Sequence, residues 1–197
     1  MRDERRTPAP MAQQPPGSEG LWTFLFMDMV IFLLLFVTFM GERLSHVALY
    51  SASQLRLNEF FGLANALLLL TSSWVVVEAV GAARAAGNAK VERCLGFALL
   101  LGAVFVINKV VEYTVKVRAG ISPATNSFFS YYYFITFIHL LHVMAGMGFM
   151  AYFRKRAATQ AGSAAFQVSL ENVGLFWHFV DVLWIFIFPM LYLMGRQ

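Results

Sequence analysis

Residues 21–40 read LWTFLFMDMVIFLLLFVTFM, a continuous apolar run that contains a single charged side chain, Asp28. A helix rises 1.5 Å per residue, so about 20 apolar residues cover the roughly 30 Å of hydrocarbon in a bilayer. The run is longer than the about 7–15 apolar residues of a secretory signal core, and no small-residue cleavage site follows it. This stretch therefore predicts a transmembrane helix and sets the fold class.

Four further apolar runs of similar length follow along the chain. They predict helices over residues 60–83, 94–115, 128–153 and 170–194. Backbone polar groups in lipid must be satisfied within the segment, which favours helices over an open sheet, and the alternating pattern of a membrane barrel is absent. The sequence thus predicts an all-α integral membrane bundle of five transmembrane helices, a single domain over residues 20–197 behind a mobile tail over residues 1–19.

The composition is that of a membrane protein. Hydrophobic residues make up 59% of the chain and charged residues 13%, about half the share of charge that soluble domains carry. The net charge of +4 does not indicate a nucleic-acid partner, because the basic residues lie in short connections between apolar runs. The one cysteine, Cys94, excludes an internal disulfide and a multi-cysteine metal site.

The Lys and Arg residues of the connections predict the orientation. Because cytoplasmic loops are enriched in Lys and Arg, the richer side should be the cytoplasm. We therefore expect a cytoplasmic N-terminus, a periplasmic C-terminus and a short surface helix in the outer connection, residues 41–59. The inner side would hold nine basic residues, Arg2, Arg5, Arg6, Arg84, Lys90, Arg93, Arg154, Lys155 and Arg156, and the outer side five, Arg43, Arg56, Lys116, Arg118 and Arg196.

Polar side chains inside the predicted spans are the candidates for function, because such residues are costly in lipid. Asp28 and Glu78 both lie about 10 Å from the cytoplasmic boundary at the helical rise. Glu171, His178 and Asp181 follow one stripe of the last helix, and two histidines three residues apart share a face of the fourth. These residues define a candidate intramembrane polar cluster: Asp28, Glu78, His139, His142, His178 and Asp181.

A second candidate site lies near the outer end of the third span. Lys109 and Glu112 are three residues apart on one helix face, so they could pair, or the lysine could extend outward to water. Their depth separates this outer polar site from the inner residues. We expect Asp28 to meet His178 and Asp181 across helices one and five, with His142 within reach.

Three chemical roles compete for the inner residues. Histidines and carboxylates could bind Zn, Fe or Cu, but the paired Glu-x-x-His motifs of di-iron bundles and an H-E-x-x-H motif are both absent. Carboxylates and imidazoles could also relay protons, as in pumps. The third role is structural: polar contacts between helices, worth about 0.6 kcal/mol each, would specify packing and hold a lipid head group. The sequence favours the structural role.

Four stretches resemble the cytochrome c oxidase subunit III family. Residues 176–184, FWHFVDVLW, are similar to its WHFVDxxW signature, and residues 137–146, FIHLLHVMAG, to its HxxHVxxG stretch. Glu112-Tyr113 and residues 65–73, NALLLLTSS, match two further motifs, while Asp28 stands where the family usually has a buried Glu. The signature residues carried over are Asn65, Tyr113, Gly146, Trp177 and Trp184.

The resemblance implies a non-catalytic subunit without haem or copper. Such a subunit braces the larger catalytic membrane subunit of a haem-copper complex, holds phospholipid and supports proton delivery, here in a bacterial cytoplasmic membrane. The family's full-length form has seven helices, and this chain lacks the first two, which form one wall of a lipid-holding cleft. The five-helix form resembles the accessory branch of nitric oxide reductases, with short subunit III forms of terminal oxidases as the near alternative.

A stand-alone proton-linked transporter or a metal-dependent membrane enzyme is the alternative from another class. Transporters favour inverted repeats and helices broken near the midplane of the membrane. The sequence shows no internal repeat, and Pro189, near the outer end of the last span, is the only proline within a predicted span.

Overall fold

The computed structural model describes residues 17–196 and contains no strand in that range. The helices are α1 (Glu19–Ser45), α2 (Val47–Gln54), α3 (Glu59–Arg84), α4 (Asn88–Arg118), α5 (Ser127–Gln160) and α6 (Ala164–Phe188). A π-helical turn, Pro189–Leu193, and a 3-10 turn, Met194–Arg196, follow α6. Most of the tail predicted over residues 1–19 lies outside the described residues, and Glu19 already belongs to α1.

Five of these helices, all except α2, are long and apolar enough to cross a membrane. All five extend beyond the starts of the predicted apolar runs, and a polar side chain caps the first turn of every one except α4, whose N-cap is Gly87. The side chains of Ser18, Asn58, Asn126 and Ser163 each accept a hydrogen bond from a backbone N–H of the helix that follows. The connection over residues 41–59 contains the expected short helix, α2.

The last span departs from the predicted continuous helix over residues 170–194. Its α-helical part begins six residues earlier, at Ala164, and ends at Phe188. Pro189 has no backbone N–H to donate to the preceding turn, so the regular α-helical ladder stops there. The chain continues as a π-helical turn that carries Tyr192 toward α4.

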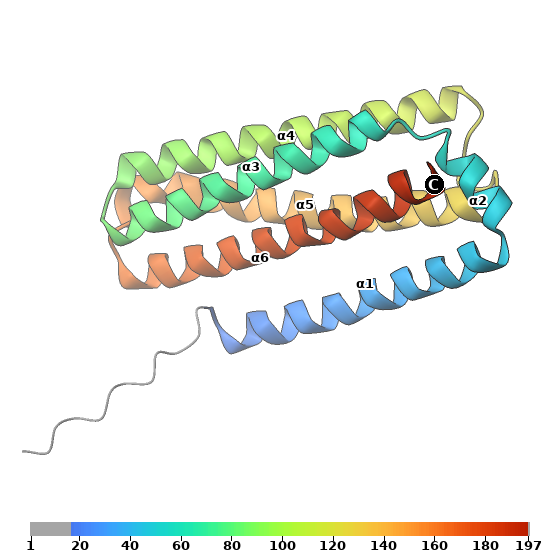
Figure 1. Cartoon of the computed structure of the whole chain (residues 1–197). Coiled ribbons are helices and arrows are strands. Elements are labelled where there is room, and N and C mark those ends of the chain that lie inside the picture. Colours follow the sequence, from blue (N-terminus) through green and yellow to red (C-terminus); the bar gives the residue numbers. More distant parts are fainter. Residues whose placement is uncertain (1–16, 197) are drawn as a thin grey trace, which may run out of the picture.

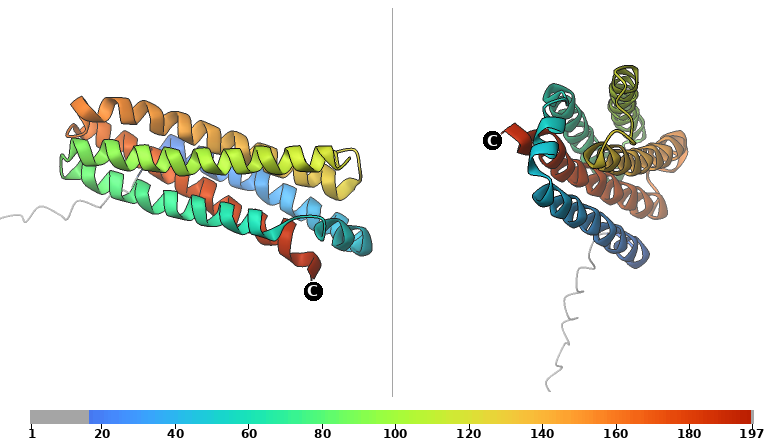
Figure 2. Two further views of the ribbon diagram at one scale, coloured as in Figure 1. Left: turned by 90° about the horizontal axis from the view of Figure 1, so that it is seen from above. Right: turned by 90° about the vertical axis from the view of Figure 1, so that its right-hand side faces the viewer.

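Helices α3 to α6 form a four-helix core, and α1 lies apart from it along α5 and α6 (Figure 1). The end-on view shows α2 crossing the end of the bundle beside the C-terminal turn (Figure 2). We call this the α2 end. The opposite end, where α1 begins and where α3–α4 and α5–α6 connect, is the Ser18 end.

The core is packed around α6, which buries 11 of its 25 residues. Trp177 and Trp184 are fully buried, and their indole N–H groups donate to the Ser72 hydroxyl at 3.2 Å and the Gly62 carbonyl at 3.3 Å. Both bonds join α6 to α3. Polar groups of these two helices therefore fix which faces meet.

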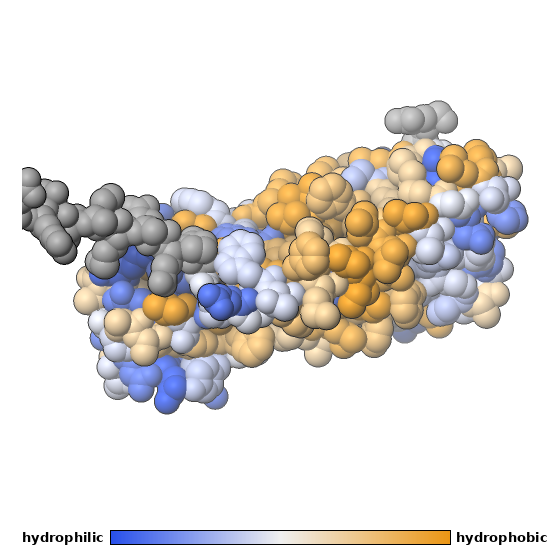
Figure 3. Space-filling model, turned by 90° about the horizontal axis from the view of Figure 1, so that it is seen from below, coloured by the Kyte–Doolittle hydropathy of each residue, from blue (hydrophilic) through white to orange (hydrophobic). Residues whose placement is uncertain are grey.

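Helix α1 packs much less closely than α6. It buries only four of its 27 residues: Leu25, Asp28, Phe32 and Phe39. Leu21, Leu35, Phe36 and Met40 pack partly against the core, and most of its other apolar side chains are exposed. On the α1 side of the molecule an apolar band separates two hydrophilic ends (Figure 3). That pattern is typical of a surface in contact with lipid or with another membrane subunit.

Candidate functional site

The Asp28 carboxylate pairs with His142, which joins α1 to α5. Asp28 Oδ2 lies 3.3 Å from His142 Nε2, and Asp28 is 8% exposed. The other ring nitrogen, Nδ1, lies 2.8 Å from the carbonyl oxygen of Ile138, which can only accept, so Nδ1 carries a proton. The contact between Nε2 and Oδ2 is an ion pair when Nε2 also carries a proton, and Oδ2 has no hydrogen-bond partner among residues 17–196.

This pair lies at one end of an apolar groove of about 690 Å³ between α1, α5 and α6. The groove runs from His142 toward the Ser18 end, where Ser18 and Asn172 line it. Its walls are largely aromatic and aliphatic. They include Leu21, Phe24, Leu141, Phe149, Phe153 and Phe176.

His178 and Asp181 do not meet Asp28. They turn toward α3, where the Ser73 hydroxyl contacts Nδ1 of His178. Asp181 is 3% exposed, and neither of its carboxyl oxygens has a hydrogen-bond partner among residues 17–196. Further along the same stripe, Glu171 pairs with Arg84 of α3 at 2.8 Å. The structure thus differs from the expected link between helices one and five, because this stripe of α6 faces α3 rather than α1.

The two remaining residues of the candidate cluster lie in different surroundings. His139 is fully buried between the rings of Phe105 and Trp184, and its ring nitrogens have no hydrogen-bond partner in the described part of the chain. Glu78 forms a largely exposed ion pair with Lys90 at 2.8 Å. The six residues therefore occupy separate places. Within residues 17–196 no three His, Cys, Asp or Glu side chains are arranged to hold a metal ion.

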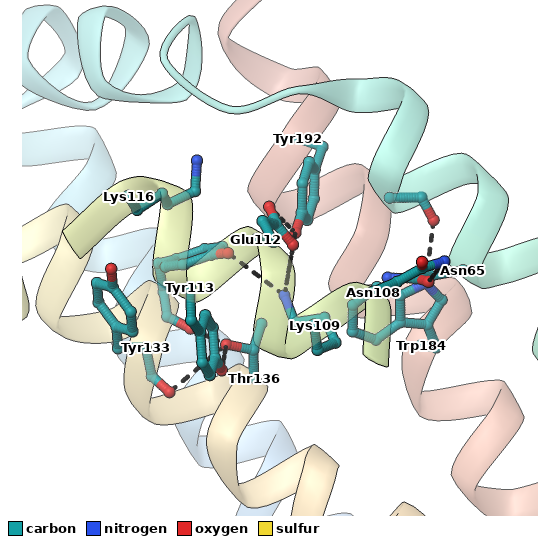
Figure 4. A network of polar contacts seen from close by, with 12 residues as sticks. Asn65, Asn108, Lys109, Glu112, Tyr113, Lys116, Tyr133, Thr136, Trp184 and Tyr192 are labelled. Carbon is teal, nitrogen blue, oxygen red and sulfur yellow. Dashed lines mark hydrogen bonds and ion pairs between the residues drawn. The ribbon is translucent and has the colours of Figure 1, made fainter. Parts of the chain in front are cut away.

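The outer polar site is one connected network (Figure 4). Lys109 Nζ lies 2.8 Å from Glu112 Oε2, and both side chains are almost fully buried. The Tyr192 hydroxyl donates to Glu112 at 2.9 Å, and the hydroxyls of Tyr132 and Tyr192 each lie 3.3 Å from Lys109 Nζ. Four aromatic rings surround the ammonium at 5.0–6.0 Å: Tyr113, Tyr132, Trp184 and Tyr192. Lys109 therefore pairs inside the bundle and does not extend to water.

Neighbouring signature residues extend this network across the core. The Tyr113 and Thr136 hydroxyls are 2.6 Å apart, which links α4 to α5. The Asn108 side-chain amide donates to the Asn65 oxygen at 3.1 Å, which links α4 to α3. Both hydrogen bonds run between helices, as expected if these polar residues specify how the helices pack.

Three residues that contact the predicted site residues were not themselves predicted as site residues from the sequence: Tyr132, Tyr192 and Ser73. Tyr132 belongs to a run of three tyrosines that resembles an interfacial aromatic belt, yet it is fully buried. Its spacing of four and seven residues from Thr136 and His139 places it on their helix face, and this signal could have found it. No local signal marks Tyr192 or Ser73, because their partners lie on other helices.

Comparison with known proteins shows the family of this chain. Residues 17–196 match the family model described as cytochrome c oxidase subunit III. The chain belongs to this family. The resemblance expected from the four motifs is thereby confirmed.

Relatives within the family come from several bacteria. The chain is 29% identical over 176 residues to cytochrome bo(3) ubiquinol oxidase subunit 3 of Pseudomonas aeruginosa, covering 89% of this chain and 84% of that one. It is 32% identical to cytochrome c oxidase subunit 3 of Alkalihalophilus pseudofirmus and 33% identical to quinol oxidase subunit 3 of Bacillus subtilis. Those matches cover 89% of this chain and 85% and 86% of the relatives.

Proposed function

We propose that this protein is a cofactor-free accessory subunit of a haem-copper terminal oxidase in a bacterial cytoplasmic membrane, where it braces the larger catalytic subunit. The observation that carries the proposal is the family match over residues 17–196. The relatives are bacterial and are named as third subunits of oxidases. Pairing of Lys109 with Glu112 and of Asp28 with His142 supports a structural role for these charges.

The same relatives favour a terminal oxidase over a nitric oxide reductase as the partner complex. The five-helix form resembles the accessory protein of nitric oxide reductases, but short chains are not peculiar to that branch. This chain covers 84–86% of the three oxidase relatives, so their lengths are similar. Oxygen reduction by the complex is therefore the activity that we propose this subunit supports.

The groove beside α1 supports a role in holding phospholipid. It is lined by apolar side chains, which suit an acyl chain, and its Ser18 end carries the Ser18 and Asn172 side chains, which suit a polar head group. The groove lies between α1, α5 and α6, all of which this five-helix chain contains. The described helices are thus sufficient to build the groove.

Support of proton delivery is the finer alternative role, and the Asp28–His142 contact is the observation that favours it. A carboxyl group and an imidazole in contact can exchange a proton, whereas a purely structural contact needs no proton transfer. The two roles predict different turnover of the complex for Asp28→Asn.

The proposed function is tested by tagging the chain, solubilising the membrane gently and identifying the proteins that co-purify. We expect a larger haem-copper subunit in stoichiometric amount, and haem absorbance in the complex but not in the separated chain. A stable chain that retains no other subunit would contradict the accessory role and favour a transporter. Stoichiometric Fe, Cu or Zn that survives chelation would also contradict it and would direct attention to His139, His142 and His178.

A further inference from the structure

Helices α3 and α6 border a hollow on the outer surface of the four-helix core, which we call the α3–α6 hollow. Its volume is about 230 Å³, and it lies beside the Arg84–Glu171 ion pair, which joins the two helices at 2.8 Å. Gly81 of α3 lines the hollow, and a Cβ atom at this position would meet nothing within 4 Å. The backbone of α3 is therefore open to the close approach of another helix. The remaining lining residues are Val77, Val80, Gly174, Leu175 and His178.

One side chain of the α3–α6 hollow has a hydrogen-bonding atom without a partner. The Nδ1 atom of His178 contacts the Ser73 hydroxyl, which fixes the orientation of the ring. The Nε2 atom is accessible at the surface of the chain, and no residue among 17–196 forms a hydrogen bond with it. If Nδ1 accepts from the Ser73 hydroxyl, Nε2 carries a proton and donates, and if Nδ1 donates, Nε2 accepts. In both tautomers Nε2 needs a partner from outside the described chain.

The depth of His178 makes lipid a poor partner for Nε2. His178 follows Glu171 by seven residues, which is about 10 Å along the helix toward the middle of the membrane. Lipid head groups lie near the level of the Arg84–Glu171 pair, and acyl chains offer no hydrogen bond, so an unpaired imidazole is costly at the depth of His178. Exposed threonines of the spans avoid this cost, because each donates to a carbonyl of its own helix: Thr38, Thr71 and Thr114.

We propose that the α3–α6 hollow is the docking site for a transmembrane helix of the larger catalytic subunit, which supplies a hydroxyl or amide group to His178 Nε2. A protein helix can both fill the hollow and place a hydrogen-bonding group at this depth, which an acyl chain cannot do. Exposed apolar side chains of α3 continue the surface around the hollow: Leu70, Trp74 and Val77. This docking site rests on the proposed function, which supplies the partner, and it specifies the face of the chain that meets that partner.

Two glycine substitutions test whether the hollow is the docking site. Gly81→Leu should fill the hollow without a clash inside this chain, because a Cβ atom there meets no neighbour. Gly148→Leu is the matched control, because Gly148 is equally open but lies on α5. We expect Gly81→Leu to lower the amount of larger subunit that co-purifies with the tagged full chain by about fivefold or more, which corresponds to about 1 kcal/mol of overpacking. Gly148→Leu should leave that amount unchanged, and the two separated chains should unfold at the same midpoint.

Two substitutions of His178 separate docking from packing within the chain. Asparagine keeps a polar atom near the position of Nδ1, for Ser73, and has none at Nε2, whereas glutamine reaches the position of Nε2. We therefore expect His178→Asn to weaken retention of the larger subunit by about threefold, the average effect of a polar contact between membrane helices. His178→Gln should preserve retention. The opposite order would show that His178 acts only through Ser73 and would overturn its assigned role in docking.

Photo-crosslinking identifies what lies against the hollow in the intact membrane. Benzoylphenylalanine replaces Val77 of α3 or Val182 of α6, and for comparison Leu100 of α4 or Met144 of α5; all four side chains are exposed. Adducts with the larger subunit should form from the first two positions, and adducts with lipid from the other two. If Val77 gave adducts only with lipid or with a second copy of this chain, the proposal would be overturned.

These measurements distinguish the docking site from the accessory role itself. If the unaltered chain retained no larger subunit, the accessory role would fail and the docking site with it. If the unaltered chain and Gly81→Leu retained the larger subunit equally, the accessory role would stand and the docking site alone would be overturned.

Discussion

Two ion pairs in this protein have the same N–O distance of 2.8 Å but opposite surroundings. The Lys109–Glu112 side chains are 0% and 3% exposed, whereas those of Lys90 and Glu78 are 56% and 44% exposed. Breaking a buried pair leaves an uncompensated charge in a medium of low dielectric, while water and salt screen an exposed one. The two pairs therefore contribute differently to stability although their geometry is the same.

We expect Glu112→Gln to destabilise the fold by about 3–5 kcal/mol, because it leaves the Lys109 ammonium without its counter-charge. Glu78→Gln is the matched control and should cause no resolvable loss. The measurement is the midpoint of unfolding in mixed detergent micelles, followed by helical circular dichroism. Equal losses in the two variants would show that the outer network does not stabilise the bundle.

The Asp28–His142 contact leads to a second prediction at the residue scale. Asp28→Leu leaves the part-buried imidazole without its carboxylate partner, which should cost about 1–3 kcal/mol and impair assembly. Asp28→Asn keeps a hydrogen-bonding side chain, so the structural role predicts normal assembly and normal turnover of the complex. Turnover is measured at matched assembly. A loss of about tenfold or more for the amide, equivalent to about 1.4 kcal/mol of barrier, would contradict the structural role and favour proton transfer.

At the scale of elements, the contact between α5 and α6 depends on the absence of a side chain. A Cβ atom at Gly146 would lie 2.6 Å from the Trp177 ring, whereas a Cβ atom at Gly148 of the same helix would meet nothing within 4 Å. Trp177 is fully buried and donates to Ser72, so it cannot move aside without losing that bond. Gly146 therefore sets how closely the two helices approach.

We expect Gly146→Ala to destabilise the bundle by about 1–3 kcal/mol, the usual cost of overpacking a core. Gly148→Ala should be neutral or slightly stabilising, because alanine favours the helix more than glycine does. Thermal unfolding of the two variants in the same detergent measures the difference. If both variants melted together with the unaltered chain, close approach of α5 and α6 would not be required.

At the scale of the whole molecule, charge at the two ends predicts how the bundle sits in the membrane. The Ser18 end carries Arg84, Lys90 and Arg93 at the α3–α4 connection, and residues 154–156 near the end of α5. Arg84 and Lys90 are paired with glutamates, but acidic residues contribute little to topology. We therefore propose that the Ser18 end is cytoplasmic.

Reporter fusions test this orientation. Alkaline phosphatase joined after residue 197 should be active, because it would fold in the periplasm, and a fluorescent protein at the same junction should be dark. Fusions within residues 161–163, at the α5–α6 connection, should give the reverse result. A cytoplasmic C-terminus would contradict both the orientation and the odd number of spans.

Much of the fold follows from the sequence because its signals are local. Apolar length predicts the spans, and the charge of the connections predicts their direction. The Lys109–Glu112 pair also lies within one helix, where residues three apart share a face. The four motifs indicate the family for the same reason, since each is a short continuous stretch.

The tertiary structure alone decided which polar residues meet across helices. Periodicity places Asp28 and His178 on definite faces, yet it does not say which helix each face meets. Close packing of Trp177 and Trp184 onto α3 and α5 turns the His178 stripe toward Ser73 and leaves Asp28 to His142. The turn after Pro189 likewise brings the Tyr192 hydroxyl to Glu112, 80 residues earlier in the chain. These contacts depend on helix order and rotation, which are set by packing between segments that are distant in the sequence.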